Sequence, residues 1–127
     1  MKKMVLVGAI LTLGAANVLA DCTPDTIVLD AGVALSGQRI EATGGEDWKE
    51  IHCSGGRLFK VGAGTVVDPE TDIGAWTTDG AVVTYKYDKP GGGTNNFTFE
   101  LHESGGTYFF CDGLSVKASG TLSPESC

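Results

Sequence analysis

The chain has 127 residues, of which 42% are hydrophobic and 20% charged, as is typical of one globular domain. Its 16 acidic and 9 basic residues give a formal net charge of −7 at pH 7. An acidic chain is a poor candidate for binding nucleic acid or an anionic membrane surface, so we expect neither partner.

Residues 1–20 have the pattern of a secretory signal peptide. Lys2 and Lys3 form a short positive region of bacterial type, an apolar run covers residues 5–13, and Ala20 ends the segment. The apolar run is too short for a transmembrane helix. We therefore expect a signal peptide at 1–20, a single secreted or periplasmic domain at 21–127, and no transmembrane segment. Loss of the two lysines would change the net charge to −9.

All four cysteines, Cys22, Cys53, Cys111 and Cys127, follow this segment. An even number of cysteines behind a signal peptide predicts two disulfides, and the absence of close cysteine and histidine clusters argues against zinc. Cys53 and Cys111 both end apolar runs, whereas Cys22 and Cys127 lie at the ends of the mature chain. The sequence therefore favours the pairs Cys53–Cys111 and Cys22–Cys127, with the local pairs Cys22–Cys53 and Cys111–Cys127 as the alternative.

The segment Leu19-Ala20-Asp21-Cys22 resembles a lipoprotein processing site. Such sites carry Gly, Ala or Ser immediately before the cysteine, and Asp21 departs from that pattern. A lipid on Cys22 would also leave one of the other three cysteines unpaired. A free N-terminus at Asp21 is therefore favoured over a lipid anchor at Cys22.

Segments with strand character occur in the first half of the mature chain at residues 27–29, 38–42, 48–53 and 57–61. In the third segment Ile51 and Cys53 are the better candidates for the core. A Ser-Gly-Gly turn at residues 54–56 joins the last two segments and predicts a hairpin.

Strand segments in the second half lie at residues 73–78, 81–88, 97–102, 107–111 and 114–118. Asp79-Gly80 between the first two is a strong hairpin signal, because a type I′ turn needs positive φ at both central residues. Residues 97–102 alternate strictly, with Phe97, Phe99 and Leu101 on one face, as in a half-buried antiparallel strand. A polar tail extends to Cys127.

We expect seven to eight of these nine segments to form short strands at nearly even spacing, and those within residues 73–111 to form a consecutive meander. The pattern predicts an all-β fold, a small antiparallel barrel or sandwich stapled by disulfides. No segment shows sustained helical periodicity.

Two histidines share strand faces with glutamates: His52 with Glu50, and His102 with Glu100. If the two strands were neighbours, the four side chains could bind a transition metal or act as an acid–base pair. Nothing in the sequence makes these strands neighbours, so two ordinary solvated faces are the favoured interpretation.

Three carboxylates, Asp68, Glu70 and Asp72, alternate as in some calcium loops. An EF-hand needs glycine at its sixth position, where this chain has Ile73. An ordinary acidic turn is favoured, and we expect no metal or other cofactor.

Most of the aromatic residues are expected in the core. Tyr108 and Phe110 lie on one face of their strand and Phe109 on the other. A strand that is apolar on both faces is either central or covers a ligand cavity, as in a small barrel that holds a hydrophobic ligand.

Residues 37–111 resemble a group of small exported bacterial β-rich proteins of unknown function. The shared landmarks are Trp48-Lys49-Glu50-Ile51-His52, Gly55-Gly56-Arg57-Leu58-Phe59-Lys60, Val67-Asp68-Pro69, Gly74-Ala75-Trp76, Tyr85-Lys86-Tyr87 and Tyr108-Phe109-Phe110-Cys111. The resemblance implies an exported β-rich protein and carries no functional residue. The Gly-x-Trp and Tyr-x-Tyr elements are also similar to lipocalin-like barrels, but are too short to assign that family.

The chain lacks Gly-x-Ser-x-Gly, His-Glu-x-x-His and phosphate-loop motifs, so we do not expect an enzyme. We expect a non-catalytic binding or structural module of the bacterial envelope or extracellular space, whose partner is a protein or an envelope component. One alternative is an inhibitor of an extracellular enzyme, acting through residues 66–72 or 89–95. Another is a barrel that binds a small hydrophobic ligand. The sequence does not define an oligomeric state.

Overall fold

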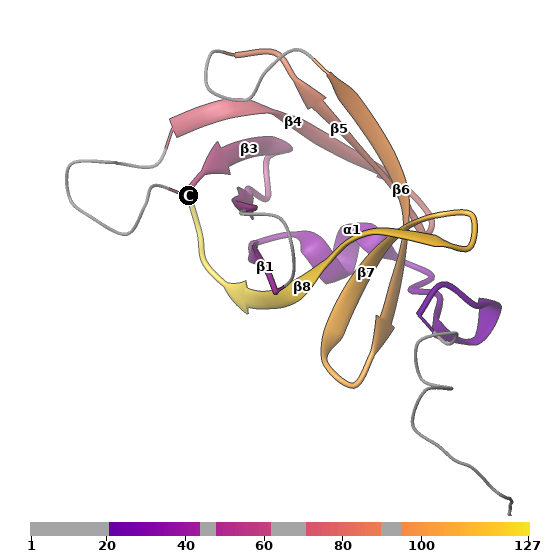
Figure 1. Ribbon diagram of the computed structural model, residues 1–127. Coiled ribbons are helices and arrows are strands. Elements are labelled where there is room, and N and C mark those ends of the chain that lie inside the picture. The colour runs from indigo at the N-terminus through magenta and orange to yellow at the C-terminus, as the bar shows by residue number, and fades with distance from the viewer. Residues whose placement is uncertain (1–20, 44–47, 62–70, 90–94) are drawn as a thin grey trace, which may run out of the picture.

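The computed structural model describes residues 21–43, 48–61, 71–89 and 95–127. In this part of the chain, eight antiparallel strands form a closed barrel in which each strand pairs with the next and the last pairs with the first (Figure 1). The strands are β1 (Gln38–Ala42), β2 (Lys49–His52), β3 (Arg57–Lys60), β4 (Thr71–Asp79), β5 (Val82–Tyr87), β6 (Asn96–Ser104), β7 (Thr107–Asp112) and β8 (Ser115–Pro124). The predicted all-β fold is confirmed, as a barrel. The expected signal peptide, residues 1–20, lies outside the described residues.

Two short helical segments precede the barrel, η2 (Pro24–Thr26) and α1 (Ala31–Leu35). Helix α1 begins after Asp30, whose carboxylate accepts a hydrogen bond of 3.1 Å from the backbone N–H of Val33. Sequence reasoning missed α1, because five residues are too few to show helical periodicity. A strand was expected at residues 27–29. That expectation is wrong, since the segment contributes only an isolated bridge between Ile27 and His102.

Helix α1 closes one end of the barrel. The side chains of Ala31 and Leu35 are fully buried and belong to the core cluster. The backbone N–H of Ala31 donates a hydrogen bond of 2.9 Å to the carbonyl of Gly80, in the turn between β4 and β5. Figure 1 shows α1 within the ring of strands. The opposite end of the barrel is the mouth, where β5 ends and β6 begins.

The hairpin expected at Asp79-Gly80 is confirmed, with its loop one residue later. Asp79 pairs with Val82, so the two loop residues are Gly80 and Ala81. Gly80 has φ of 60°, and the first loop position is where a type II′ turn takes glycine.

Inward-facing side chains from the strands and α1 fill the barrel with one core cluster: Ala31, Leu35, Ile40, Leu58, Ile73, Trp76, Val83, Tyr85, Leu101 and Phe110. The predicted alternation of β6 is confirmed, because Leu101 is fully buried and Phe99 packs against the core cluster. An eight-stranded barrel leaves an interior that such side chains can fill.

Ile51 and Cys53 are buried, as predicted, but the solvated face expected for Glu50 and His52 on β2 is wrong. Trp48 packs against the core cluster, Glu50 is 7% exposed, and His52 is fully buried. These three side chains face the interior, so they do not form a solvated face. Ile51 is also fully buried, but it lies on the outer face of β2 and is not part of the core cluster. Glu50 and His52 were expected on a solvated face because they are polar. Inside this barrel, however, both have hydrogen-bond partners.

The disulfides join Cys22 to Cys111 and Cys53 to Cys127. Both pairings considered from the sequence are therefore wrong. The register explains the second bond, because His52 on β2 and Pro124 on β8 flank the same residue of β1, Gln38. The chain segments that follow β2 and β8 thus leave the barrel side by side.

The first disulfide follows from the N-terminal segment. Ile27 bridges His102 on β6, and β6 pairs with β7, which carries Cys111. Cys22, five residues before Ile27, is thereby brought to the outside of β7. Its sulfur is bonded to Cys111, so in this structure it is not free to carry the thioether of a lipid anchor.

Strand β8 is longer than the expected segment 114–118. It continues to Pro124 and pairs with β1 as well as β7, so residues expected to form a polar tail close the barrel. The two disulfides are typical of an oxidising compartment outside the cytoplasm. Among the described residues, no helix combines the length and apolar character needed to cross a membrane.

Candidate binding pocket at the barrel mouth

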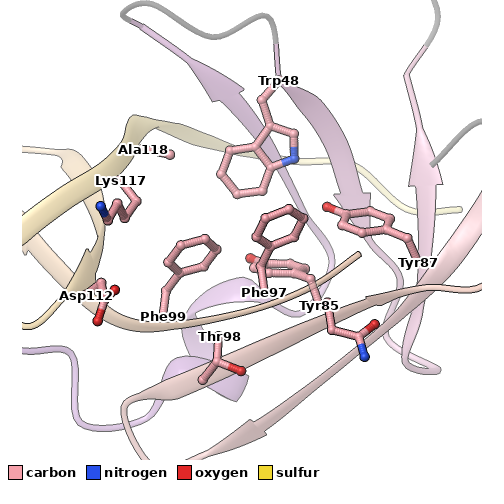
Figure 2. A pocket seen from close by; sticks show the side chains of 10 residues that line it. Trp48, Tyr85, Tyr87, Phe97, Thr98, Phe99, Asp112, Lys117 and Ala118 are labelled. Atoms are coloured by element: carbon pink, nitrogen blue, oxygen red, sulfur yellow. The ribbon is translucent and has the colours of Figure 1, made fainter. Parts of the chain in front are cut away.

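A cavity of about 620 Å³ lies at the barrel mouth (Figure 2). Small-molecule sites in proteins typically have volumes of about 300–1,000 Å³. The lining residues are Trp48, Tyr85, Tyr87, Asn96, Phe97, Thr98, Phe99, Asp112, Lys117 and Ala118. They come from the residue before β2, the end of β5, the start of β6, the end of β7 and the start of β8.

Five of the ten residues that line the cavity are aromatic. The rings of Phe97 and Phe99 are nearly parallel, at 5°, with centroids 6.2 Å apart. Tyr87 meets Phe97 at 70° and 6.0 Å, and Trp48 meets Tyr85 at 88° and 5.7 Å. Figure 2 shows Trp48 facing Phe97 and Phe99 across the cavity. Parallel and edge-to-face contacts of this kind are favourable arrangements of aromatic rings.

The strand register explains why these rings gather. Tyr85 on β5 pairs with Phe97 on β6, and Val83 pairs with Phe99, so inward-facing residues of the two strands lie beside one another. Phe97 is 43% exposed, although its ring faces the cavity. An aromatic side chain left half in water at a concave surface is a feature of binding sites.

Charged and polar side chains occupy one edge of the cavity. Asp112 and Lys117 are both exposed there, on the side opposite Tyr87 (Figure 2). Asn96 and Thr98 add an amide and a hydroxyl at the start of β6. The cavity therefore combines an apolar wall with hydrogen-bonding groups at its rim.

Behind the wall, the hydroxyl of Tyr87 donates to the carboxylate of Glu50, with distances of 3.0 and 3.1 Å to its two oxygens. Burial raises the pKa of Glu50, and the hydrogen bond from Tyr87 partly opposes this. Burial and the Glu50 charge raise the pKa of Tyr87, so its hydroxyl stays protonated. The buried indole N–H of Trp48 makes no hydrogen bond of good geometry within the described part of the chain.

His52 supports the same wall from deeper in the barrel. Its Nδ1 atom lies 3.0 Å from the carbonyl oxygen of Gln38, and its Nε2 atom lies 2.7 Å from the hydroxyl of Tyr85. Burial lowers the pKa of His52 to about 4, so the ring is neutral at neutral pH. A carbonyl can only accept, so Nδ1 carries the proton and Nε2 accepts from Tyr85. Both ring nitrogens are thus occupied.

The two His–Glu pairs do not meet. Strand β2 pairs with β1 and β3, whereas β6 pairs with β5 and β7. His102 is buried on the outside of β6, with Nε2 2.8 Å from Glu100 and Nδ1 2.7 Å from the hydroxyl of Thr26. No group of three or more metal-ligating side chains occurs among the described residues.

Of the three candidate calcium ligands, Asp68 and Glu70 lie outside the described residues. Asp72 is on β4, where Arg57 binds its carboxylate at 2.8 Å and also contacts Asp88 at 2.9 Å. The Arg57 hydrogen bond lowers the pKa of Asp72. The Asp72 carboxylate is therefore paired with the Arg57 guanidinium, and Arg57, Asp72 and Asp88 form a surface ion-pair network.

Sequence reasoning assigned most aromatic residues to the core and associated a ligand cavity with the strand that carries Tyr108, Phe109 and Phe110. These three residues are not among those that line the cavity. The alternation of Tyr85 with Tyr87 and of Phe97 with Phe99 was the available signal, since it placed each pair on one face. Nothing in the sequence indicated that Asp112 or Lys117 would join them.

Comparisons with protein-family models, curated proteins and solved structures found no match to this chain. The pocket is therefore interpreted from its own geometry. That geometry offers a rigid apolar wall, an exposed ring and a charged rim, and it can hold a small flat molecule.

Proposed function

We propose that this protein is a non-catalytic binding protein that holds a small, flat, largely apolar molecule in its barrel mouth. The observation that carries the proposal is the aromatic cavity of about 620 Å³, open at one end of a barrel whose other end is closed by α1. Eight-stranded barrels can hold one small ligand, and barrel mouths are among the common places for ligand sites.

The size of the apolar wall supports useful affinity. A planar ligand that removed roughly 250 Å² of apolar surface from water would gain about 6 kcal/mol. Part of the interaction is lost to immobilisation, which the fixed rings keep small on the protein side. After that loss we expect dissociation constants on the order of hundreds of micromolar for simple aromatic compounds.

The buried ionisable groups support binding rather than catalysis. His52 uses one ring nitrogen on Gln38 and the other on Tyr85, so neither is directed at a ligand. Glu50 lies behind Tyr87 and does not line the cavity. A general acid or base must reach the reacting group, and these two residues act on the wall instead.

We place the protein in the bacterial periplasm or outside the cell. The signal-like segment at residues 1–20 and the two disulfides support this location. The segments suggested for an enzyme inhibitor, 66–72 and 89–95, lie largely outside the described residues, so no observation favours that alternative.

The proposal is tested with N-phenyl-1-naphthylamine, an uncharged naphthalene dye whose fluorescence increases in apolar sites. We expect saturable binding to the wild-type protein, weakened about fivefold by Phe97→Ala, because the lost contact is worth about 1 kcal/mol. The control is Leu29→Ala, which removes an exposed apolar side chain at the closed end. Absence of saturable binding, or equal loss in both variants, would overturn the proposal.

A further inference from the structure

Lys117 is the extra residue of a β-bulge in β8. Phe110 on β7 pairs with Ala118, and the next residue, Cys111, pairs with Val116. Lys117 therefore has no partner on β7. Successive residues of a regular strand point to opposite faces, yet Lys117 and Ala118 both line the cavity. The bulge redirects the lysine side chain, as bulges beside functional sites do.

The ammonium group of Lys117 is available to a ligand. Arg39 and Arg57 each bind two carboxylates, whereas Lys117 has no ion pair within the described ranges. It is exposed, and it is the one basic side chain among the described residues that line the cavity. An ammonium on a flexible stem can donate three hydrogen bonds to an anion.

Asp112 brings the opposite charge to the same edge of the cavity (Figure 2). It lies at the end of β7, where it pairs with Ser115 and where ordinary strand alternation after Phe110 directs it inward. Lys117 reaches the cavity only because β8 contains an additional residue. Lys117 is therefore the charged residue whose position depends on the bulge, whereas Asp112 reaches the cavity by ordinary alternation.

We infer that Lys117 gives the mouth a preference for flat apolar ligands that carry one anionic group, such as an aromatic sulfonate or carboxylate. This inference rests on the proposed function, and it adds the chemical class of the ligand. The apolar body lies against Phe97 and Phe99, and the anion lies at the edge within reach of Lys117. Asp112 weakens the same interaction by charge repulsion.

Two dyes with one ring system test the inference. N-phenyl-1-naphthylamine is neutral, and 1-anilinonaphthalene-8-sulfonate adds a single sulfonate. We expect Lys117→Gln to weaken sulfonate binding about fivefold at low ionic strength and to weaken binding of the neutral dye clearly less, because that dye can lose only contact with the lysine stem. Lys117→Arg should preserve sulfonate binding, and Asp112→Asn should strengthen it.

The outcomes separate the inference from the proposed function. Unchanged sulfonate affinity in Lys117→Gln, an equal loss for both dyes, or weaker sulfonate binding in Asp112→Asn would overturn the inference while neutral binding stands. If the neutral dye does not bind the wild-type protein at the mouth, both the proposed function and the inference fail.

Discussion

The Nε2 atom of His52 lies 2.7 Å from the hydroxyl oxygen of Tyr85, inside the barrel and against the cavity wall. The other ring nitrogen of His52 binds the carbonyl of Gln38 on β1. The histidine thus connects β1, β2 and β5 through polar contacts inside the barrel. Tyr85 also lines the cavity, so its hydrogen bond with His52 contributes both to the stability of the barrel and to the shape of the pocket.

This arrangement predicts that acid destabilises the protein through His52. The pKa of His52 in the folded protein is about 4, whereas an unfolded histidine has its ordinary value of 6.5. Between these two values the unfolded state binds the proton and the native state does not. Stability is therefore full above pH 6.5 and decreases, by on the order of 3 kcal/mol, as the pH falls to 4. Urea unfolding at pH 7 and pH 4 measures the change.

The matched variants are His52→Gln and His52→Leu. Glutamine can donate to Gln38 and accept from Tyr85, so the first variant should fold with a smaller loss on acidification. Leucine leaves both partners unsatisfied and should cost about 1–3 kcal/mol per group at neutral pH. If His52→Gln keeps the wild-type pH dependence, the histidine is not the titrating group.

Glu50 predicts an effect of the opposite sign. Burial raises its native pKa above the ordinary value of 4.5, so the stability contributed by its proton is present at low pH and is lost as the pH rises through the native pKa. Glu50→Gln should therefore match or exceed wild-type stability at neutral pH. Tyr87→Phe removes the hydroxyl that binds the carboxylate and should cost about 1–3 kcal/mol in the wild-type background.

A double-mutant cycle provides the control. In the Glu50→Gln background, where a neutral amide replaces the carboxylate, Tyr87→Phe should cost less, because no charge is left without its partner. An equal cost of Tyr87→Phe in both backgrounds would show that the tyrosine hydroxyl does not stabilise the Glu50 charge.

The sequence predicted the all-β fold class, and it predicted side-chain orientation correctly where hydrophobic alternation decides that orientation. Phe97, Phe99 and Leu101 face inward as predicted, because strand alternation places these three apolar side chains on one face of β6 and that face lines the barrel interior. The same reasoning failed for His52 and Glu50. Their burial depends on partners from β1 and β5, and those partners are known only once the strands are paired.

The sequence did not predict the disulfide pairing or the cavity at the mouth, for a related reason. Cys53 and Cys127 meet because β8 closes the barrel against β1, and the sequence had not shown β8 reaching that far. Lys117 enters the cavity through a single inserted residue in the β7–β8 register. Register is set by the whole barrel, so local patterns do not reveal either feature.

Disulfide mapping tests the register directly. Non-reducing peptide analysis should recover the pairs Cys22–Cys111 and Cys53–Cys127. Replacing Cys53 and Cys127 together by serine should lower the free energy of unfolding by about 4 kcal/mol, because their bond spans 74 residues in sequence. Recovery of Cys53–Cys111 would contradict the barrel closure described above.

The seam between β1 and β8 also depends on Gly120. A β-carbon at this position would collide with the backbone carbonyl of Glu41 on β1. Gly120→Ala should therefore destabilise the barrel by about 1–3 kcal/mol, since backbone atoms in a paired strand cannot move aside cheaply. Gly55→Ala is the control, because a β-carbon there meets no atom within 4 Å. Equal melting temperatures for the two variants would contradict the close approach of β1 and β8 at Gly120.

The central claim is that ligands bind at the barrel mouth. The most direct test is a two-dimensional NMR titration of isotope-labelled protein with N-phenyl-1-naphthylamine. The account predicts saturable shifts at the Trp48 indole N–H and the backbone amides of Lys117 and Ala118, with little change at Leu29 and Val33. Shifts confined to Leu29 and Val33, which are exposed at the closed end, or no saturable shifts at all, would contradict it.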